Sequence, residues 1–203
     1  MGLTSVQLDR MGVGKRWWYV TRDGMDVEGS MYPIICKYIM HIEDMAERGL
    51  GLFLMGDNDV GKTSAAVIVL KAARFAGFSC FFIREADLID AMRDRSTDES
   101  KHIIESATAA EFLVVDDVGK VYRTNSGFAE RELDNFLRKR AGDMLPTILT
   151  ANIGPDKIQA IYGDSMYRLL KETTIAHVCR GKQLRDKIAA DNLAHFNSLG
   201  DAS

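Results

Sequence analysis

Five short, mostly apolar segments recur along the chain, and glycine, proline or charged residues lie at or near the ends of each. They are too short for helices and too continuously apolar for strands that face solvent on one side. This pattern is typical of strands buried on both faces of a parallel sheet. The predicted strands occupy residues 50–55, 79–83, 112–115, 147–149 and 174–178.

Between these strands, apolar residues recur at three- and four-residue spacing, which indicates helices with one buried side. Ile35, Ile39 and Ile42 show this spacing in the first such segment, which Gly49 ends. The predicted helices cover residues 32–48, 62–76, 85–95, 99–109, 128–141, 155–161, 164–171 and 182–196.

Strands that alternate with helices predict an α/β fold, in which a parallel sheet is covered on both faces. The 203 residues suit one domain of ordinary size. We therefore expect three layers around a five-stranded, mostly parallel sheet. We expect a short N-terminal segment, residues 1–30, a main domain, residues 31–203, and no large C-terminal lid domain after residue 196.

The composition is that of a globular protein, with 46% hydrophobic and 27% charged residues. No apolar run approaches the roughly 20 residues of a membrane helix, and the N-terminus lacks the pattern of a signal peptide. The three cysteines are far apart, which favours free thiols in a reducing cytoplasm over zinc or disulfides. A net charge of −3 gives no global footprint for nucleic acid, so any DNA contact must come from a local patch.

One segment has the pattern G-x-x-x-x-G-K-[ST] and lies between a predicted strand and a predicted helix. In this setting the backbone N–H groups of the turn converge on phosphate oxygens, helped by the dipole of the following helix. The lysine reaches the β- and γ-phosphates, and the hydroxyl after it binds Mg²⁺. The predicted nucleotide-binding residues of this phosphate loop are Gly56, Asp57, Asn58, Asp59, Val60, Gly61, Lys62, Thr63 and Ser64.

Two acidic residues make this loop unusual, because Asp59 stands where many such loops have glycine and Asp57 adds a second negative charge. Asp tolerates left-handed backbone better than most residues, so the turn is feasible. Both carboxylates have to point away from the nucleotide.

The third predicted strand ends in two carboxylates, Asp116 and Asp117. We expect Asp116 to hold Mg²⁺ together with Thr63, and Asp117 to orient or deprotonate an attacking water. The expected ligands are ATP and Mg²⁺, and the expected reaction is ATP hydrolysis. Taken by itself, the pair also fits a polar turn after a buried strand.

A predicted strand and two predicted helices, residues 79–109, separate the phosphate loop from the acidic strand. This spacing predicts an additional strand between those two strands in the sheet, as in ATPases that use a strand-end carboxylate. Asn152 follows the next strand, where its amide would reach the γ-phosphate or the attacking water. The alternative for Asn152 is an ordinary turn residue.

With these motifs the sequence resembles the AAA+ ATPases, and most closely the branch of DnaC/DnaI-type helicase loaders and IstB-type transposition ATPases. The resemblance covers about residues 10–187, and the phosphate loop and residues 114–119 match the two Walker motifs. It implies the AAA+ core of the P-loop NTPase fold. Residues 10–17 are similar to the segment that cradles adenine, with Val13 as the nucleotide-binding residue, so residues 1–30 are expected to form a short tail and the adenine-side segment.

The resemblance also implies catalytic roles beyond Lys62 and Asp117. Asn152 matches the sensor-1 position, and Arg168 matches the arginine finger that a neighbouring subunit supplies. Arg185 matches sensor 2, although its surroundings follow the family pattern loosely. For Arg168 the alternative is a surface arginine on a helix.

Residues 120–140 are locally basic, with six cationic and three acidic side chains. In this branch, DNA-contacting loops follow the acidic strand, so the resemblance implies that Lys120, Tyr122 and Arg123 contact DNA. They combine charge with an aromatic ring, as single-strand binding does. A solvated helix face is the alternative. The six cations are Lys120, Arg123, Arg131, Arg138, Lys139 and Arg140.

As a whole, the resemblance implies an ATP-dependent helicase loader in the bacterial cytoplasm, in a compact form such as a phage or mobile element carries. It would self-associate into a spiral or ring, bind single-stranded DNA and help to place a replicative DnaB-type hexameric helicase. The alternative is an IstB-like transposition ATPase that binds duplex DNA and recruits a transposase. A third hypothesis, suggested by the acidic phosphate loop, is a nucleotide-gated binding module with negligible turnover.

Overall fold

The computed structural model of the chain describes residues 2–26, 29–120 and 127–181, together with Ala190, Leu193, Ala194 and Phe196. Its sheet consists of β1 (Gly51–Gly56), β2 (Cys80–Arg84), β3 (Phe112–Val118), β4 (Thr147–Ala151) and β5 (Thr174–Cys179). Its α-helices are α1 (Ser5–Arg10), α2 (Tyr32–Met40), α3 (Ile42–Glu47), α4 (Lys62–Phe75), α5 (Glu85–Arg93), α6 (Asp98–Ala109), α7 (Phe128–Gly142) and α8 (Pro155–Thr173).

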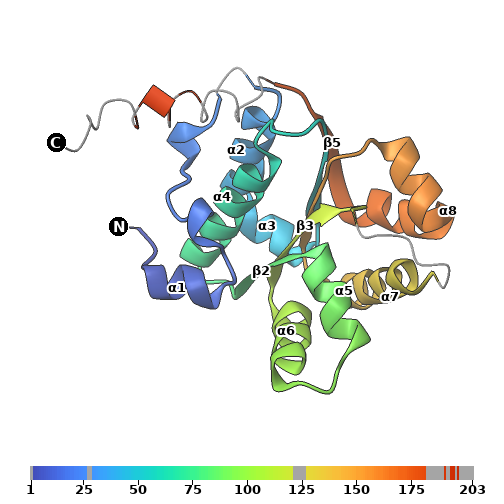
Figure 1. Cartoon of the computed structure of the whole chain (residues 1–203). Helices are drawn as coiled ribbons and strands as arrows, with labels where there is room; N and C mark the ends of the chain where they lie inside the picture. Colours follow the sequence, from blue (N-terminus) through green and yellow to red (C-terminus); the bar gives the residue numbers. More distant parts are fainter. Residues whose placement is uncertain are drawn as a thin grey trace.

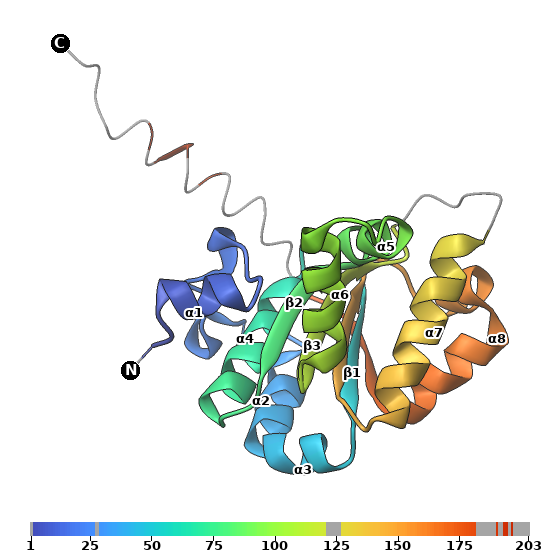
Figure 2. The ribbon, with the colours of Figure 1, turned by 90° about the horizontal axis from the view of Figure 1, so that it is seen from below.

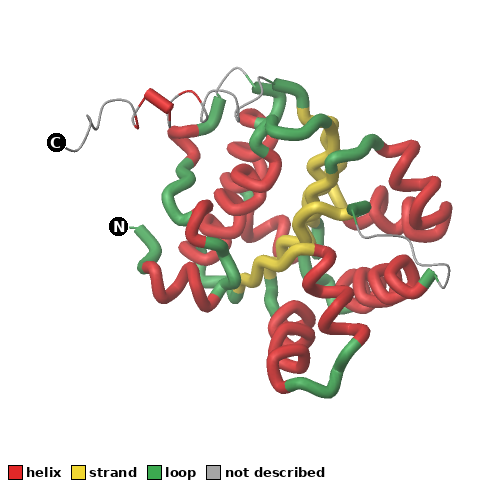
Figure 3. The backbone as a smooth tube through the Cα atoms, viewed as in Figure 1, coloured by secondary structure: helices red, strands yellow, loops and turns green. Residues whose placement is uncertain are grey.

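The sheet forms the middle of three layers (Figure 1). Helices α1–α4 lie on one side of it and helices α5–α8 on the other, which the second view confirms (Figure 2). In Figure 3 the strands form a band between the two groups of helices. Among the helices that the structure describes, none is long and apolar enough to cross a membrane.

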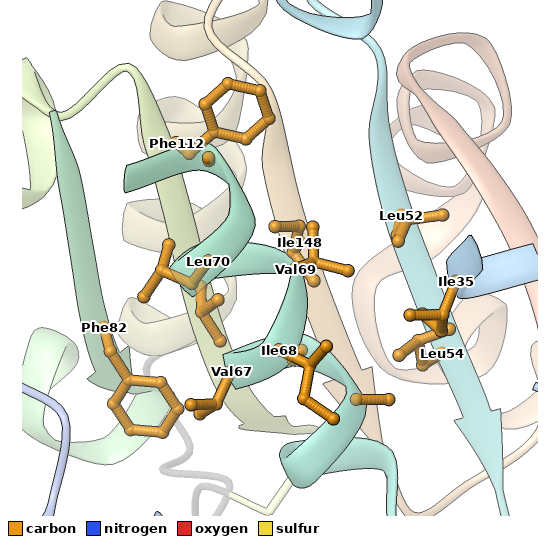
Figure 4. Packing of buried hydrophobic residues seen from close by; sticks show 14 of the residues in the cluster. Ile35, Leu52, Leu54, Val67, Ile68, Val69, Leu70, Phe82, Phe112 and Ile148 are labelled. Atoms are coloured by element: carbon orange, nitrogen blue, oxygen red, sulfur yellow. The ribbon is translucent and has the colours of Figure 1, made fainter. Parts of the chain in front are cut away.

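Successive residues of the central strands face opposite helical layers, which explains why these strands are apolar along most of their length. In β1, Leu52 and Leu54 belong to the core cluster on the α4 side, whereas Phe53 and Met55 belong to the cluster on the α5–α8 side. Figure 4 shows the first cluster around α4, with side chains of the helix packed onto the strands. The helical layers thus bury the central strands from both sides, whereas the edge strand β5 leaves Ile175 and Val178 exposed.

The strands run in the order β2-β3-β4-β1-β5, and every neighbouring pair is parallel. The expected fold class is confirmed, with all five strands parallel. An additional strand does lie between the strand of the phosphate loop and the acidic strand, but it is β4. The spacing argument assigns this place to residues 79–83, which form the edge strand β2 instead. Strand order depends on how the connecting helices cross over the sheet, and sequence spacing alone does not fix it.

Two helical predictions concern breaks in the chain. The single helix predicted for residues 32–48 is two helices, because His41 has non-helical backbone angles (φ −116°, ψ 31°). The predicted break between residues 161 and 164 is confirmed as a kink inside α8, where Gly163 adopts φ 80°. A side chain there would be strained, so glycine permits the bend. The last predicted helix, residues 182–196, lies for the most part outside the described residues.

The N-terminal segment contains a helix, α1, that the sequence analysis did not predict. Thr4 and Gln7 form a capping box at its start. Leu8, Met11 and Val13 then join the same core cluster as α2 and α4. This packing carries the following residues across the surface towards the phosphate loop.

Candidate nucleotide-binding site

The phosphate loop joins the end of β1 to the start of α4. Its turn uses left-handed backbone at three places, with φ 123° at Gly56, 68° at Asp59 and 90° at Gly61. Asp59 thus adopts the conformation that the sequence analysis required of it. At Gly56 a β-carbon would also lie 2.5 Å from the carbonyl oxygen of Cys179 on β5, so only glycine fits here.

Lys62 is buried at the first position of α4, with 5% of its surface exposed. Its ammonium donates to the carbonyl oxygens of Gly56, at 3.0 Å, and Asp57. Burial lowers the pKa of Lys62, while Cys179, Asp117 and Asp57 act in the opposite direction. The lysine is therefore a desolvated cation held inside the loop, where its charge acts most strongly on a bound anion.

Asp116, near the end of β3, accepts two hydroxyl hydrogen bonds on one oxygen. Thr63 Oγ1 lies 2.9 Å and Thr150 Oγ1 2.6 Å from Asp116 Oδ1. Burial raises the pKa of Asp116, and the bonds from Thr150 and Thr63 partly offset that rise. A hydroxyl and a carboxylate in contact at a phosphate loop are hard oxygen ligands of the kind that Mg²⁺ takes alongside phosphate oxygens. The residues present therefore fit this metal.

Asp117 is the next residue, and its carboxylate faces a second set of partners. Asn152 Nδ2 donates to Asp117 Oδ1 at 2.7 Å, and Lys120 Nζ lies 2.9 Å from Asp117 Oδ2. The backbone of Asp117 is left-handed (φ 64°), and its N–H donates to Thr150 Oγ1 at 3.0 Å. Since β3 and β4 are neighbours, their ends bring the acidic pair, Thr150 and Asn152 together.

These side chains surround one pocket of about 300 Å³, here called the phosphate pocket. Of the predicted residues, it brings together Asn58, Asp59, Gly61, Lys62, Thr63, Ser64, Asp116, Asp117, Lys120 and Asn152. Its lining is completed by Arg84, which sequence reasoning missed, and by Arg16 and Trp17, which come from the segment expected at the adenine and lie at the phosphate side instead. Arg84 ends β2, so its place at the carboxyl edge of a parallel sheet was a usable signal.

A second pocket, of about 280 Å³, adjoins the first and shares Gly61 and Ser64 with it. This second pocket, here called the base pocket, is largely apolar, and much of its lining comes from the N-terminal segment. Its further residues are Tyr19, Val20, Thr21, Gly24, Met25, Asp26, Gly29, Met31, Val60, Ile68, Arg180 and Gly181.

Val13, the predicted adenine-side residue, lies in the core with 2% of its surface exposed. It does not line the base pocket, but its carbonyl oxygen accepts a hydrogen bond from Trp18 Nε1 at 2.7 Å. The described part of the lining segment contains one short 3-10 helix, Arg22–Gly24, and its sequence has no periodic pattern, so the sequence did not indicate which of its residues line the pocket. Ser30 fastens it to the end of β5, because Ser30 Oγ accepts from the Arg180 N–H at 2.9 Å.

The other predicted residues lie apart from these pockets or outside the described residues. Arg168 is exposed on α8, beside Arg138 and Glu172, and is not part of the phosphate pocket lining. Tyr122, Arg123 and Arg185 lie outside the part of the chain that the structure describes. The structure therefore does not bring Arg168 to the phosphate loop of its own chain.

The basic stretch at residues 120–140 is weaker than its composition suggested. Arg140 is 1% exposed, and its guanidinium donates inward to backbone carbonyls and to Thr147. Arg138 is paired with Asp134 on the same helix. Arg140 therefore contributes nothing to a surface patch, because its guanidinium holds secondary-structure elements together inside the protein.

Comparison with known proteins places this geometry among related ATP-binding folds. The family described as "IstB-like ATP binding protein" matches residues 40–182. No curated protein matches the chain in sequence.

Among solved structures, a DnaC helicase loader superposes with a TM-score of 0.72 at 21% identity, covering 82% of this chain and 100% of that one. DnaI gives 0.69 at 15% identity, covering 84% and 93%. The replication initiator DnaA bound to AMPPCP and single-stranded DNA gives 0.64 at 17% identity, covering 88% of this chain and 55% of DnaA. At these identities the likeness shows the fold.

Proposed function

Because this chain belongs to the family of IstB-like ATP-binding proteins, we propose that it binds ATP with Mg²⁺ in the two adjoining pockets and hydrolyses it. One observation carries this proposal: two contacts lie together at neighbouring strand ends. The Thr63 hydroxyl donates a hydrogen bond to Asp116, and the Asn152 amide donates one to Asp117. The first pair supplies metal ligands, and the second supplies a base with a group that orients it.

In the proposed reaction, the loop N–H groups and Lys62 hold the phosphates, and Thr63 and Asp116 hold the metal. Bound Mg²⁺ would neutralise charge on the phosphate oxygens. Asp117 accepts a proton from the attacking water, and Asn152 keeps the Asp117 carboxylate in place. The buried position of Lys62 and Asp116 strengthens each charge interaction at the site.

Steady-state ATP hydrolysis by Asp117→Asn tests the reaction. We expect a fall in kcat of about 10²–10⁴-fold, the usual contribution of a general base, with ATP still bound. Asp98→Asn, an exposed carboxylate at the start of α6, is the matched control and should hydrolyse like the unmodified chain. An unchanged rate in Asp117→Asn would remove Asp117 from the mechanism. If the unmodified chain does not hydrolyse ATP, the hypothesis that remains is a nucleotide-gated binding module with negligible turnover.

The base pocket is the proposed adenine site, so residues 1–30 act as the adenine side of the ATPase domain at residues 31–203. Met25 and Met31 offer apolar surface to a base, and Ser30 keeps the segment closed on β5. Val13 supports the lining indirectly, because its carbonyl oxygen holds Trp18, the residue before Tyr19 of the lining. Met25→Trp, which fills the pocket, is expected to weaken ATP binding much more than binding of inorganic triphosphate. Equal losses would place the base elsewhere.

Arg168 is proposed to act on the nucleotide of a neighbouring copy in a spiral or ring. Its support is its position, exposed on α8 and away from the phosphate pocket of its own chain. A guanidinium delivered this way neutralises charge on the γ-phosphoryl group. Arg185 is proposed as a second sensor of the nucleotide.

At the level of biology, we propose an ATP-dependent helicase loader that engages single-stranded DNA and a replicative DnaB-type hexameric helicase. The support is the shared fold with the DnaC helicase loader and with DnaA bound to single-stranded DNA. Lys120, Tyr122 and Arg123 are the proposed DNA contacts. Retention of a hexameric replicative helicase by the tagged chain, in an ATP-dependent manner, is the expected result. No retention in any nucleotide state would contradict loading.

The family match itself favours a second candidate, an IstB-like transposition ATPase that binds duplex DNA and recruits a transposase. The two candidates differ in the DNA on which the protein assembles. Sedimentation with ATP and either duplex or single-stranded DNA separates them. ATP-dependent oligomers on duplex DNA alone would favour transposition, and oligomers on single strands alone would favour loading.

A further inference from the structure

Both oxygens of the Asp117 carboxylate are engaged by side-chain donors. Asn152 Nδ2 contacts Oδ1 at 2.7 Å, and Lys120 Nζ lies 2.9 Å from Oδ2. An oxygen that takes a proton from water must face that water with a lone pair. Each oxygen keeps a second lone pair. Asn152 holds Oδ1 in place, and the Lys120 ammonium occupies one approach to Oδ2, the oxygen that Asn152 does not contact.

The backbone around this contact is fixed, whereas the lysine side chain is not. The Lys120 N–H donates to the Asp117 carbonyl at 3.3 Å, which closes the turn. The Gly119 N–H donates to Glu85 Oε2 at 2.8 Å, and Glu85 is 1% exposed. Lys120 itself has 53% of its side chain exposed. The ammonium can therefore swing away while the turn and Asp117 stay in place.

We propose that Lys120 is a positioning residue whose ammonium keeps Asp117 from accepting a proton from water until nucleic acid binds. The phosphates of a nucleic-acid strand then bind the Lys120 ammonium, and Asp117 is free to act as the base. This inference rests on the proposed function, with Asp117 as the base. It makes one residue serve two sites, because Lys120 lines the phosphate pocket and faces solvent. Nucleic acid then raises the rate of hydrolysis without touching the nucleotide.

The size of the effect follows from the exposure of the pair. The side chains of Lys120 and Asp117 are 53% and 34% exposed, so water weakens their attraction. Exposed pairs of this kind shift an equilibrium by about two- to fivefold. A contact this weak is readily exchanged for phosphate oxygens, which bind lysine strongly along a polyanion. The contact therefore slows hydrolysis moderately and does not abolish it.

Steady-state hydrolysis by the full chain, with and without oligodeoxythymidylate, tests this inference. Lys120→Met is expected to raise the DNA-free kcat about two- to fivefold, to leave KM for ATP unchanged, and to remove stimulation by the oligonucleotide. Lys120→Arg keeps a cation that reaches Asp117, and should restore both the low basal rate and the stimulation. A merely structural role would not give this split between kcat and KM.

Lys101→Met is the matched control, because Lys101 and Asp98 form an ion pair of the same three-residue spacing, at 3.3 Å, on α6. It is expected to behave like the unmodified chain. A Lys120→Met rate equal to or below that of the unmodified chain would overturn the inference, as would a raised rate that the oligonucleotide still stimulates in full. If neither the unmodified chain nor Lys120→Met hydrolyses ATP, the proposed function fails as well. If the unmodified chain hydrolyses ATP and Lys120→Met does not raise the DNA-free rate, only the inference about Lys120 fails and the proposed function stands.

Discussion

At the residue scale, Asp116 is a predicted metal ligand whose burial disfavours its ionised form and so lowers the stability of the fold near neutral pH. The residue is 6% exposed, and its carboxylate accepts hydroxyl hydrogen bonds from Thr63 and Thr150 on one oxygen. Burial still raises its pKa, because two neutral donors do not replace the water that an ionised carboxylate loses. A divalent cation bound to Asp116 would favour the ionised form of its carboxylate.

The first prediction is that Asp116→Asn stabilises the nucleotide-free protein near neutral pH. A carboxyl whose pKa is raised by folding contributes most stability when protonated, and that contribution is lost as pH rises through the folded pKa. The amide keeps an acceptor for Thr63 and Thr150 without a charge. Thermal unfolding should therefore give a higher Tm for the variant at neutral pH, with the gap closing under acid conditions, while Mg²⁺-dependent hydrolysis is lost. A lower Tm at neutral pH would contradict this account.

The cysteines give a second prediction at this scale. Burial raises the pKa of the Cys80 and Cys179 thiols to about 12 each, so at about pH 8 the reactive thiolate is scarce. In the native protein we expect iodoacetamide to spare both, even though Cys80 is partly exposed like Cys36, and to label Cys36 first. Mass spectrometry after alkylation measures this, and full labelling in guanidinium serves as the control. Early labelling of Cys179 would mean that β5 opens beside the phosphate loop.

At the element scale, Arg140 ties three elements into one unit. From α7 its guanidinium donates to the carbonyl oxygens of Ala107, at 2.9 Å, and Ala110, at 2.8 Å, at the end of α6. It also donates to Pro146 and Thr147 at the start of β4. Burial lowers the pKa of Arg140 to about 10, with Asp143 acting against that shift. These contacts hold in place the strand that carries Thr150 and precedes Asn152.

The third prediction concerns this unit. Arg140→Met should lower the free energy of unfolding by about 3–5 kcal/mol, because several buried carbonyl groups lose their donor at once. Exposed Lys139→Met, one residue earlier on the same helix, should change it by less than about 0.5 kcal/mol. Urea unfolding followed by circular dichroism measures both. Similar small changes in the two variants would show that the carbonyl groups find other donors.

Element positions were predictable where the pattern was local. Strands bounded by glycine or proline were placed to within a few residues, although β3 runs on to Val118. The helix α1 was not predicted, because only Leu8 of its six residues is buried and no apolar periodicity is visible in its sequence. Arg140 was counted among the surface cations, since charge predicts exposure unless a tertiary partner is known. Its partners come from α6 and β4, and nothing in the sequence of α7 indicates them.

At the scale of the whole molecule, parallel strands bring the site together at one edge of the sheet. The phosphate loop and the acidic pair were predictable, because each is a run of consecutive residues with its own chemistry. The individual residues of the N-terminal segment that line the base pocket were not, because they reach it through packing of that segment. Arg84 was a different case: its place at the end of a predicted strand was a usable signal for this edge of the sheet, and the placement of β2 beside β3 brings it to the pocket.

A fourth prediction belongs to the assembly. Neither Lys62→Ala nor Arg168→Ala should hydrolyse ATP well alone, since one loses its nucleotide and the other its finger. Mixed in equal amounts, they should recover about one quarter of the unmodified rate per subunit, because intact sites form where a Lys62→Ala copy serves an Arg168→Ala neighbour. Hydrolysis rates of the mixture measure this. No recovery, with assembly confirmed by sedimentation, would count against action between copies.

The central claim is that the phosphate loop and the acidic pair serve one nucleotide and one metal. Calorimetric titration of the full chain with ATP, in the presence and absence of Mg²⁺, tests it most directly. We predict one saturable site per chain that is strengthened by Mg²⁺, lost in Lys62→Ala, and no longer sensitive to the metal in Asp116→Asn. The absence of saturable binding of ATP or ADP with Mg²⁺ present would contradict the account.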